Sequence, residues 1–248
     1  MEASHARSIS VRSGGGAMVA MLGIAIFLHA LDRGNFATAA PVIKDALTLS
    51  NTEIGLLLSA FYWTYVPGHI LSGWLIERIN AYRTLALGLA TWSLATLLTG
   101  FAGGFVALFI LRLLLGLGES AGFPASSKLL AMHLPPERLG FANGLVGAGL
   151  SLGQAGGVLL AGLVLAAAGW QALFFLFGAL SMLWLLPWYF VARNAAHMPR
   201  QAAVADAGPS YRELLARREM WGAMLGHFCG NYTYFLVTSW LPLFLVKE

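Results

Sequence analysis

Charged side chains are scarce in this chain. Aspartate, glutamate, lysine and arginine together make up only 10% of its 248 residues, whereas 58% are hydrophobic. Because a soluble domain is typically about one quarter charged, this composition excludes an ordinary soluble domain. We expect a polytopic membrane protein whose outer surfaces face the lipid bilayer.

Cysteine is scarcer still, with Cys229 the single one in the chain. This excludes an intramolecular disulfide framework and a cysteine-based metal cluster. The sequence also lacks a nucleophile elbow, a P-loop, an HExxH motif and a dinucleotide fingerprint in a suitable context. We therefore predict that the chain is not an enzyme and has no catalytic residue, metal or cofactor.

Long apolar runs dominate what remains. A membrane-spanning helix requires about 20 mainly apolar residues. Seven stretches qualify, namely 17–41, 53–75, 84–102, 105–130, 140–168, 170–192 and 220–245. The predicted fold is an all-α polytopic membrane protein, with a disordered cytoplasmic tail over 1–16, a six-helix unit over 17–192, a cytoplasmic linker over 193–219 and a seventh helix within 220–248.

Lysine and arginine fall mostly on one side of the predicted membrane. Cytoplasmic loops are enriched in both residues. With the N-terminus inside, eleven of the fifteen lie in cytoplasmic segments, two lie outside and two lie within spans. Because they are spread over short loops, the net charge of +4 does not indicate a nucleic-acid partner. The expected location is the inner membrane of a bacterium.

Four charges stand well inside the predicted spans, away from the span ends. Arg112 and Glu119 are seven residues apart in LRLLLGLGESAGFPASSK, so they share one face of a helix, and Asp32 and Arg33 are adjacent in the first span. Intramembrane charges usually face the interior of a bundle and mark a transport pathway. For Asp32 and Arg33 the alternative is a local ion pair that lets the helix end near an interface. Asn35 lies one turn from Asp32.

Three uncharged polar residues are also candidates for a cavity. Tyr65 lies well inside the second span, Gln154 lies beside a stripe of glycines in the fifth, and Asn231 lies in the seventh. A tyrosine can instead anchor a helix at the membrane interface. Glycines at four-residue spacing let helices approach closely, and amides can bond neighbouring helices.

A short charged turn, GWLIERINAYRTL, follows the second span. It resembles the loop between the second and third spans of the major facilitator superfamily, which has a glycine, an acid four residues later, a basic residue, a second glycine and further basic residues. The matching residues are Gly73, Glu77, Arg78 and Arg83. Asn80 stands where the family has the second glycine, and Tyr82 stands where a basic residue is common. Asparagine tolerates the left-handed conformation.

Three further segments look like the anion:cation symporter branch of that superfamily. They are LDRGNFATAAP, RLLLGLGESAGFPASSK and GNYTYFLVTSWLPLFLVK. The branch includes proton symporters for sugar acids and hexuronates. The resemblance implies a six-helix N-terminal half with a gating loop at Gly73 to Arg83. It also implies proton-coupled symport of an organic anion.

Each half of the six-helix unit is expected to contribute one acid and one arginine. Transporters of this type contain inverted three-helix repeats, so Asp32 and Arg33 correspond to Glu119 and Arg112. An anion that engages an arginine would leave a carboxylate without its partner, and that carboxylate would take up a proton.

The residue roles rest on the resemblance as much as on the charges. Arg33 is expected to bind the substrate carboxylate through its planar fork. Glu119 and Asp32 are expected to carry protons, and Arg112 to tune Glu119. The expected polar contacts to substrate are Tyr65, Gln154 and Asn231.

The number of spans leaves other functions open. The superfamily normally has twelve spans in two halves, so the chain is expected to be truncated, or a partner supplies the remainder. The 248-residue chain alone is predicted to perform no alternating access. The alternatives are a non-transporting fragment or a membrane interaction or sensor protein on a transporter scaffold. An aromatic or dicarboxylic acid is the alternative substrate.

Overall fold

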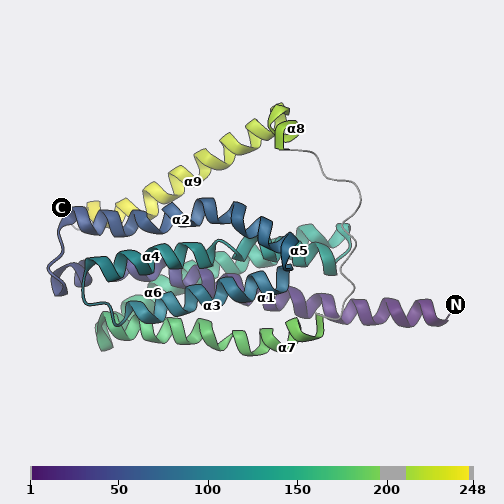
Figure 1. The fold of residues 1–248 in the computed structure, drawn as a ribbon, viewed down its shortest axis with the longest axis horizontal. Coiled ribbons are helices and arrows are strands. Elements are labelled where there is room, and N and C mark those ends of the chain that lie inside the picture. The colour runs from purple at the N-terminus through teal and green to yellow at the C-terminus, as the bar shows by residue number, and fades with distance from the viewer. Residues whose placement is uncertain (1, 196–210, 246–248) are drawn as a thin grey trace. The chain divides into compact units, whose positions relative to one another are not determined.

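Helices make up all the secondary structure of the part of the chain that the computed structural model describes, residues 2–195 and 211–245. Their bounds are α1 Glu2–Ala46, α2 Asn51–Arg78, α3 Ala81–Thr99, α4 Phe105–Glu119, α5 Gly122–His133, α6 Pro136–Leu183, α7 Leu185–Ala195, α8 Tyr211–Ala216 and α9 Arg218–Leu245 (Figure 1). The chain forms two compact units, Met1–Ala196 and His197–Glu248. The predicted all-α fold is confirmed.

Four helical stretches among the described residues are long and apolar enough to cross a membrane. They are Gly15–Ala46, Asn51–Arg78, Phe105–His133 and Pro136–Arg193. The last contains the fifth and sixth predicted spans, and α3 and α9 cover the third and the seventh. Each apolar run in the sequence therefore corresponds to a helical segment.

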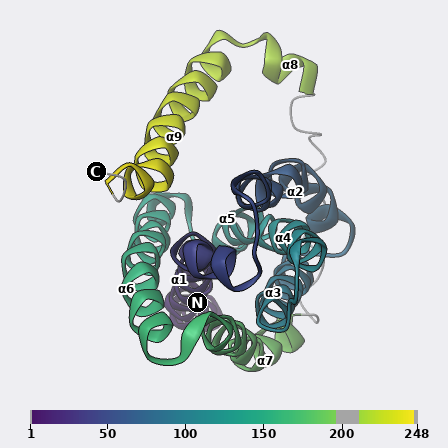
Figure 2. The ribbon, with the colours of Figure 1, turned by 90° about the vertical axis from the view of Figure 1, so that its left-hand side faces the viewer.

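The chain reverses direction at Gly169 inside α6. Gly169 has φ 82° and ψ 175°, a conformation that suits glycine because it has no Cβ. Gly157 and Ser181 lie twelve residues before and after it, and they contact Leu31 and Asp32 respectively. Both arms of this hairpin therefore pass the middle of α1, and Figure 2 shows the turn from α6 toward α7.

Glycines bring α6 directly onto α1. A Cβ on Gly149 would lie 2.6 Å from the carbonyl oxygen of Gly23, and one on Gly157 would lie 2.8 Å from the carbonyl oxygen of Leu31. A Cβ on Gly153 would collide with the Phe27 carbonyl. The glycine stripe thus has the packing role expected of small residues in a membrane, and it fixes the rotation of α1 about its axis.

The fourth predicted span breaks directly after Glu119. Pro124 has no N–H to donate to the carbonyl of Ser120, and its ring crowds that carbonyl. Helix α4 ends at Glu119, the Ala121 N–H bonds the carbonyl of Gly118 at 3.3 Å, and α5 begins at Gly122. The break places Glu119 at a bend within the bundle.

Two polar segments contain more helix than we expected from the sequence. Helix α1 begins at Glu2, so the start that we expected to be disordered is helical. An existing helix extends at low cost because nucleation is the unfavourable step. Within the expected linker 193–219, α7 continues to Ala195 and α8 and α9 begin at Tyr211 and Arg218, while residues 196–210 lie outside the described part.

The turn before α3 holds Asn80 in a conformation that is nearly restricted to glycine. Its φ is 149° and its ψ is 162°, a region that costs a residue with a side chain about 1–3 kcal/mol. Its Oδ1 accepts the backbone N–H of Arg83 at 2.9 Å and so caps α3. This explains why the resembling family has glycine here and how asparagine is tolerated.

Replacing Asn80 by glycine should stabilise the protein. Asn80→Gly releases the strain, and glycine at a helix N-cap is only a few tenths of a kcal/mol worse than asparagine, so the free energy of unfolding should rise by about 1 kcal/mol. Asn80→Ala keeps the strain and loses the cap, so this variant should lower the free energy of unfolding by about 1 kcal/mol. Thermal unfolding of the purified chain in detergent measures both, and a decrease for both variants would contradict this account.

Candidate functional site

Glu119 is the centre of the buried charges. Its side chain is 0% exposed, and its Oε2 accepts a hydrogen bond from Arg33 Nη2 at 3.4 Å. The same oxygen lies 3.2 Å from Nε2 of His29. Because Arg33 and His29 lie four residues apart on α1, one face of that helix presents both to the end of α4.

The Nε2 atom of His29 lies between a hydrogen-bond donor and a hydrogen-bond acceptor. Its Nε2 is 3.1 Å from Arg33 Nη2 and 3.2 Å from Glu119 Oε2. Arginine can only donate and an ionised carboxylate can only accept. Nε2 therefore either accepts from Arg33 or, when it carries a proton, donates to Glu119. The contacts of this one nitrogen depend on where the proton sits.

Three buried atoms at this cluster have no hydrogen-bond partner among the described residues. They are Nδ1 of His29, Nε of Arg33 and Oε1 of Glu119. A buried polar atom without a partner is costly and usually has a functional reason. Our sequence prediction did not include His29, although its spacing of four residues from Arg33 was a signal that could have identified it.

Arg33 lies on an aromatic surface and stays partly open. Its guanidinium carbon is 4.5 Å from the ring centroid of Tyr65 and 5.3 Å from that of Phe61. Such contacts stabilise a desolvated cation. The side chain is 17% exposed, and its Nε has no partner among the described residues. The structure thus brings together predicted residues Arg33, Tyr65 and Glu119.

Arg112 is held apart from this salt bridge. Its Nε donates to the backbone carbonyl of Leu57 at 3.2 Å, and its guanidinium carbon lies 4.5 Å from the ring centroid of Phe36. Arg33, the residue that we expected to bind substrate, makes the direct ion pair with Glu119. A tuning role of Arg112 would have to act over a longer distance.

Asp32 faces a different helix from its neighbour. Its Oδ2 accepts the Ser181 hydroxyl at 3.0 Å, and its Oδ1 accepts Nδ2 of Asn35 at 3.3 Å. Consecutive side chains on an α-helix point about 100° apart, so Asp32 meets α6 while Arg33 meets Glu119. Since α1 continues to Ala46, the alternative of a local Asp32–Arg33 pair at a helix end is wrong.

Two predicted residues are not brought to Glu119 by the described contacts. Gln154 is half-buried on α6 beside Gly153. Asn231 belongs to the second unit, where its Nδ2 donates to the carbonyl of His227 at 3.0 Å. Their contact with substrate stays a prediction.

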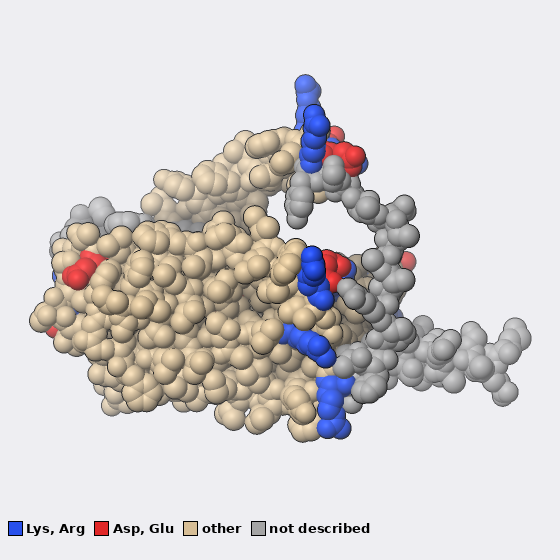
Figure 3. Space-filling view, viewed as in Figure 1, with Lys and Arg blue, Asp and Glu red and all other residues tan. Residues whose placement is uncertain are grey.

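Basic residues gather at one end of the first unit, which we call the basic end. Its lysine and arginine residues are Arg78, Arg83, Lys128, Arg138 and Arg193. Figure 3 shows blue side chains gathered toward this end of the first unit.

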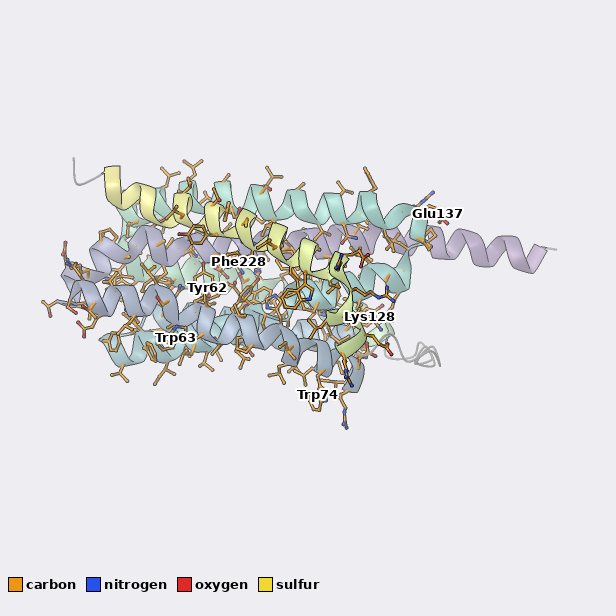
Figure 4. The ribbon with its side chains drawn as sticks, turned by 90° about the horizontal axis from the view of Figure 1, so that it is seen from above. Tyr62, Trp63, Trp74, Lys128, Glu137 and Phe228 are labelled. Atoms are coloured by element: carbon orange, nitrogen blue, oxygen red, sulfur yellow. The ribbon has the colours of Figure 1, made fainter. Side chains whose placement is uncertain are left out.

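The predicted gating loop lies at the basic end. Lys128 Nζ is 2.9 Å from Glu77 Oε1, and the Arg78 guanidinium carbon is 5.1 Å from the ring centroid of Trp74. Trp74 and Lys128 lie at the same end of the bundle in Figure 4. A Cβ on Gly73 would meet open space. An exposed ion pair therefore links α2, at the start of the loop, to α5.

Known proteins that are similar to this chain are membrane transporters. A family model described as Major Facilitator Superfamily matches residues 22–248. A probable sulfoacetate transporter of Cupriavidus necator is 30% identical over 237 residues, covering 88% of this chain and 54% of the relative. A probable L-galactonate transporter of Escherichia coli is 30% identical over 239 residues, covering 91% and 53%.

A solved structure shares the fold. A bacterial homolog of the human lysosomal transporter Spinster, inward-facing and unoccupied, superposes with a TM-score of 0.77 at 21% identity. The match covers 94% of this chain and 56% of that one. The chain thus spans about half the length of the relatives that it matches.

The Arg33–Glu119 pair should behave as a coupled unit in stability measurements. Arg33→Gln leaves a buried carboxylate without its cation and should lower the free energy of unfolding by about 3–5 kcal/mol. Adding Glu119→Gln should recover most of that loss because no uncompensated charge remains. Thermal unfolding in detergent of the unchanged chain, the two single variants and the double variant measures this coupling.

The exposed Lys128–Glu77 pair is the matched control. Lys128→Gln should lower the free energy of unfolding by no more than about 1 kcal/mol because exposed ion pairs contribute little.

For the buried pair, a simple sum would contradict the account. If the losses in free energy of unfolding from Arg33→Gln and Glu119→Gln were additive in the double variant, Arg33 and Glu119 would not form the pair described.

Proposed function

The chain belongs to the Major Facilitator Superfamily, and we propose that it forms one half of a proton-coupled symporter for small organic anions. The observation that supports this best is the buried Glu119 carboxylate shared by Arg33 and His29. In this proposal Arg33 binds the anion and Glu119 carries the proton.

The exchange of partners at Arg33 couples the two solutes. Its partly exposed guanidinium has an unused Nε donor, and the planar fork of arginine suits a carboxylate. When a second anion binds there, two negative charges compete for one cation in a site of low dielectric constant. Uptake of a proton by Glu119 removes one of these charges, so binding of the anion and of the proton favour each other.

His29 gives Glu119 a second partner during that exchange. When Arg33 turns to the substrate, a protonated Nε2 on His29 can donate to Glu119 across their 3.2 Å separation. Asp32 is a second candidate proton carrier on the α6 side of α1, where Ser181 holds it. Arg112 is proposed to tune Glu119 through its positive charge.

A sugar acid or hexuronate is the proposed substrate class. The relatives' names include L-galactonate and sulfoacetate, both small organic anions. Tyr65 beside Arg33 offers a hydroxyl, and Gln154 and Asn231 are proposed to add amide contacts. Aromatic and dicarboxylic acids are the alternative, which a panel of labelled acids separates.

Transport is proposed for this chain together with a second six-helix half. Substrate sites in this superfamily lie between repeats that rock against each other, and the chain spans about half of its relatives. The basic end is proposed to face the cytoplasm of a bacterial inner membrane, as the positive-inside rule indicates. A non-transporting interaction or sensor protein is the competing function.

Uptake into proteoliposomes separates these functions. We would fuse the chain to the remaining half of the Escherichia coli relative and impose an inward proton gradient. The fusion should concentrate labelled L-galactonate. Glu119→Gln should abolish gradient-driven accumulation but retain exchange of labelled for unlabelled anion, because only the proton carrier is lost.

Two controls accompany this experiment, a variant outside the proposed site and the chain without a second half. Arg138→Gln, at an exposed arginine outside the gating loop, should retain gradient-driven uptake. The 248-residue chain without the second half should show none. Accumulation by the Glu119→Gln fusion would refute the proton role, and accumulation by the chain alone would refute the need for a second half.

A further inference from the structure

A hollow lies between α3 and α7 at the basic end. Its volume is about 400 Å³, and its lining residues are Arg83, Ala86, Leu185, Trp188, Tyr189, Ala192 and Arg193. Helices α3 and α7 lie side by side in Figures 1 and 2, and none of the residues that line the hollow belongs to the group of His29, Arg33, Tyr65 and Glu119. The hollow is therefore separate from the Glu119 cluster.

The hollow combines an apolar floor with two cations at its edge. Its apolar lining includes Ala86, Leu185 and Ala192, which we call the apolar floor. Arg83 stands at the start of α3, Arg193 stands in the last turn of α7, and both are exposed. Within residues 2–195 and 211–245, neither guanidinium forms an ion pair with a carboxylate. No described carboxylate therefore competes with an external anion for either charge.

Aromatic side chains make one wall rigid. Trp188 is 0% exposed, its Nε1 donates to the carbonyl of Tyr82 at 3.1 Å, and its ring stacks on that of Tyr82 with centroids 5.7 Å apart. Tyr189 is exposed beside it. Tyrosine and tryptophan are enriched at the level of lipid headgroups, so this wall consists of residue types that are typical of that level.

We propose that this hollow binds an anionic phospholipid, with its phosphate between Arg83 and Arg193 and an acyl chain over Ala86, Leu185 and Ala192. Basic pockets between membrane helices suit such headgroups, because each basic residue near the surface strengthens binding about fivefold. The apolar floor favours a lipid over a free phosphate ion, which has no acyl chain to cover it.

Native mass spectrometry of the purified chain tests this site. Phosphatidylglycerol should remain bound in preference to phosphatidylcholine, and excess inorganic phosphate should not displace it. Arg83→Gln with Arg193→Gln should weaken phosphatidylglycerol binding about tenfold or more. Ala192→Trp keeps both charges and fills the floor, so it should also reduce binding.

Matched variants keep the test specific. Arg78→Gln with Arg138→Gln removes two exposed arginines from the same end outside the hollow, and Ala167→Trp adds the same bulk at an exposed site near the Gly169 turn. Both should bind phosphatidylglycerol as the unchanged chain does. Equal retention of the two lipids, an equal loss in the Arg78 and Arg138 control, or unchanged binding by Ala192→Trp would overturn the proposal.

Discussion

The buried ion pair between Arg33 and Glu119 is the constraint on which the rest of the first unit depends. Charges inside a bilayer are costly unless they are paired, and this pair joins α1 to the end of α4 across a 3.4 Å contact. The pair forms only if α1 is rotated correctly and α4 ends at the right residue. Gly149 and Gly157 fix the rotation by letting α6 touch the α1 backbone, and Pro124 sets the break after Glu119.

The same rotation of α1 directs the adjacent side chains of Asp32 and Arg33 to different helices. With Arg33 directed at Glu119, Asp32 meets Ser181 on the second arm of the α6 hairpin. The hairpin turn at Gly169 is therefore linked to the charge arrangement, because Gly157 before it and Ser181 after it pack at the same level of α1. Each buried carboxylate has its own partners, and a change at one need not release the other.

Much of the fold followed from local pattern, and the partners of the charges did not. Apolar runs predicted the helices, and glycine spacing predicted that α6 approaches a neighbouring helix closely, which the structure identifies as α1. The family pattern marked Asn80 as the residue in a glycine position. Spacing along one helix says which residues share a face, but the distance between two helices depends on tertiary packing. For this reason the sequence suggested Arg112 as the neighbour of Glu119, and only the structure showed Arg33 and His29 there.

The central claim is that Glu119 takes up a proton when an anion binds Arg33. Infrared difference spectroscopy of the fusion with the Escherichia coli half, on addition of L-galactonate, tests this most directly because it distinguishes a protonated carboxyl group from a carboxylate. The account predicts a new carboxylic acid band that is absent in Glu119→Gln and in Arg33→Gln. Anion binding with no protonation of Glu119 would contradict it.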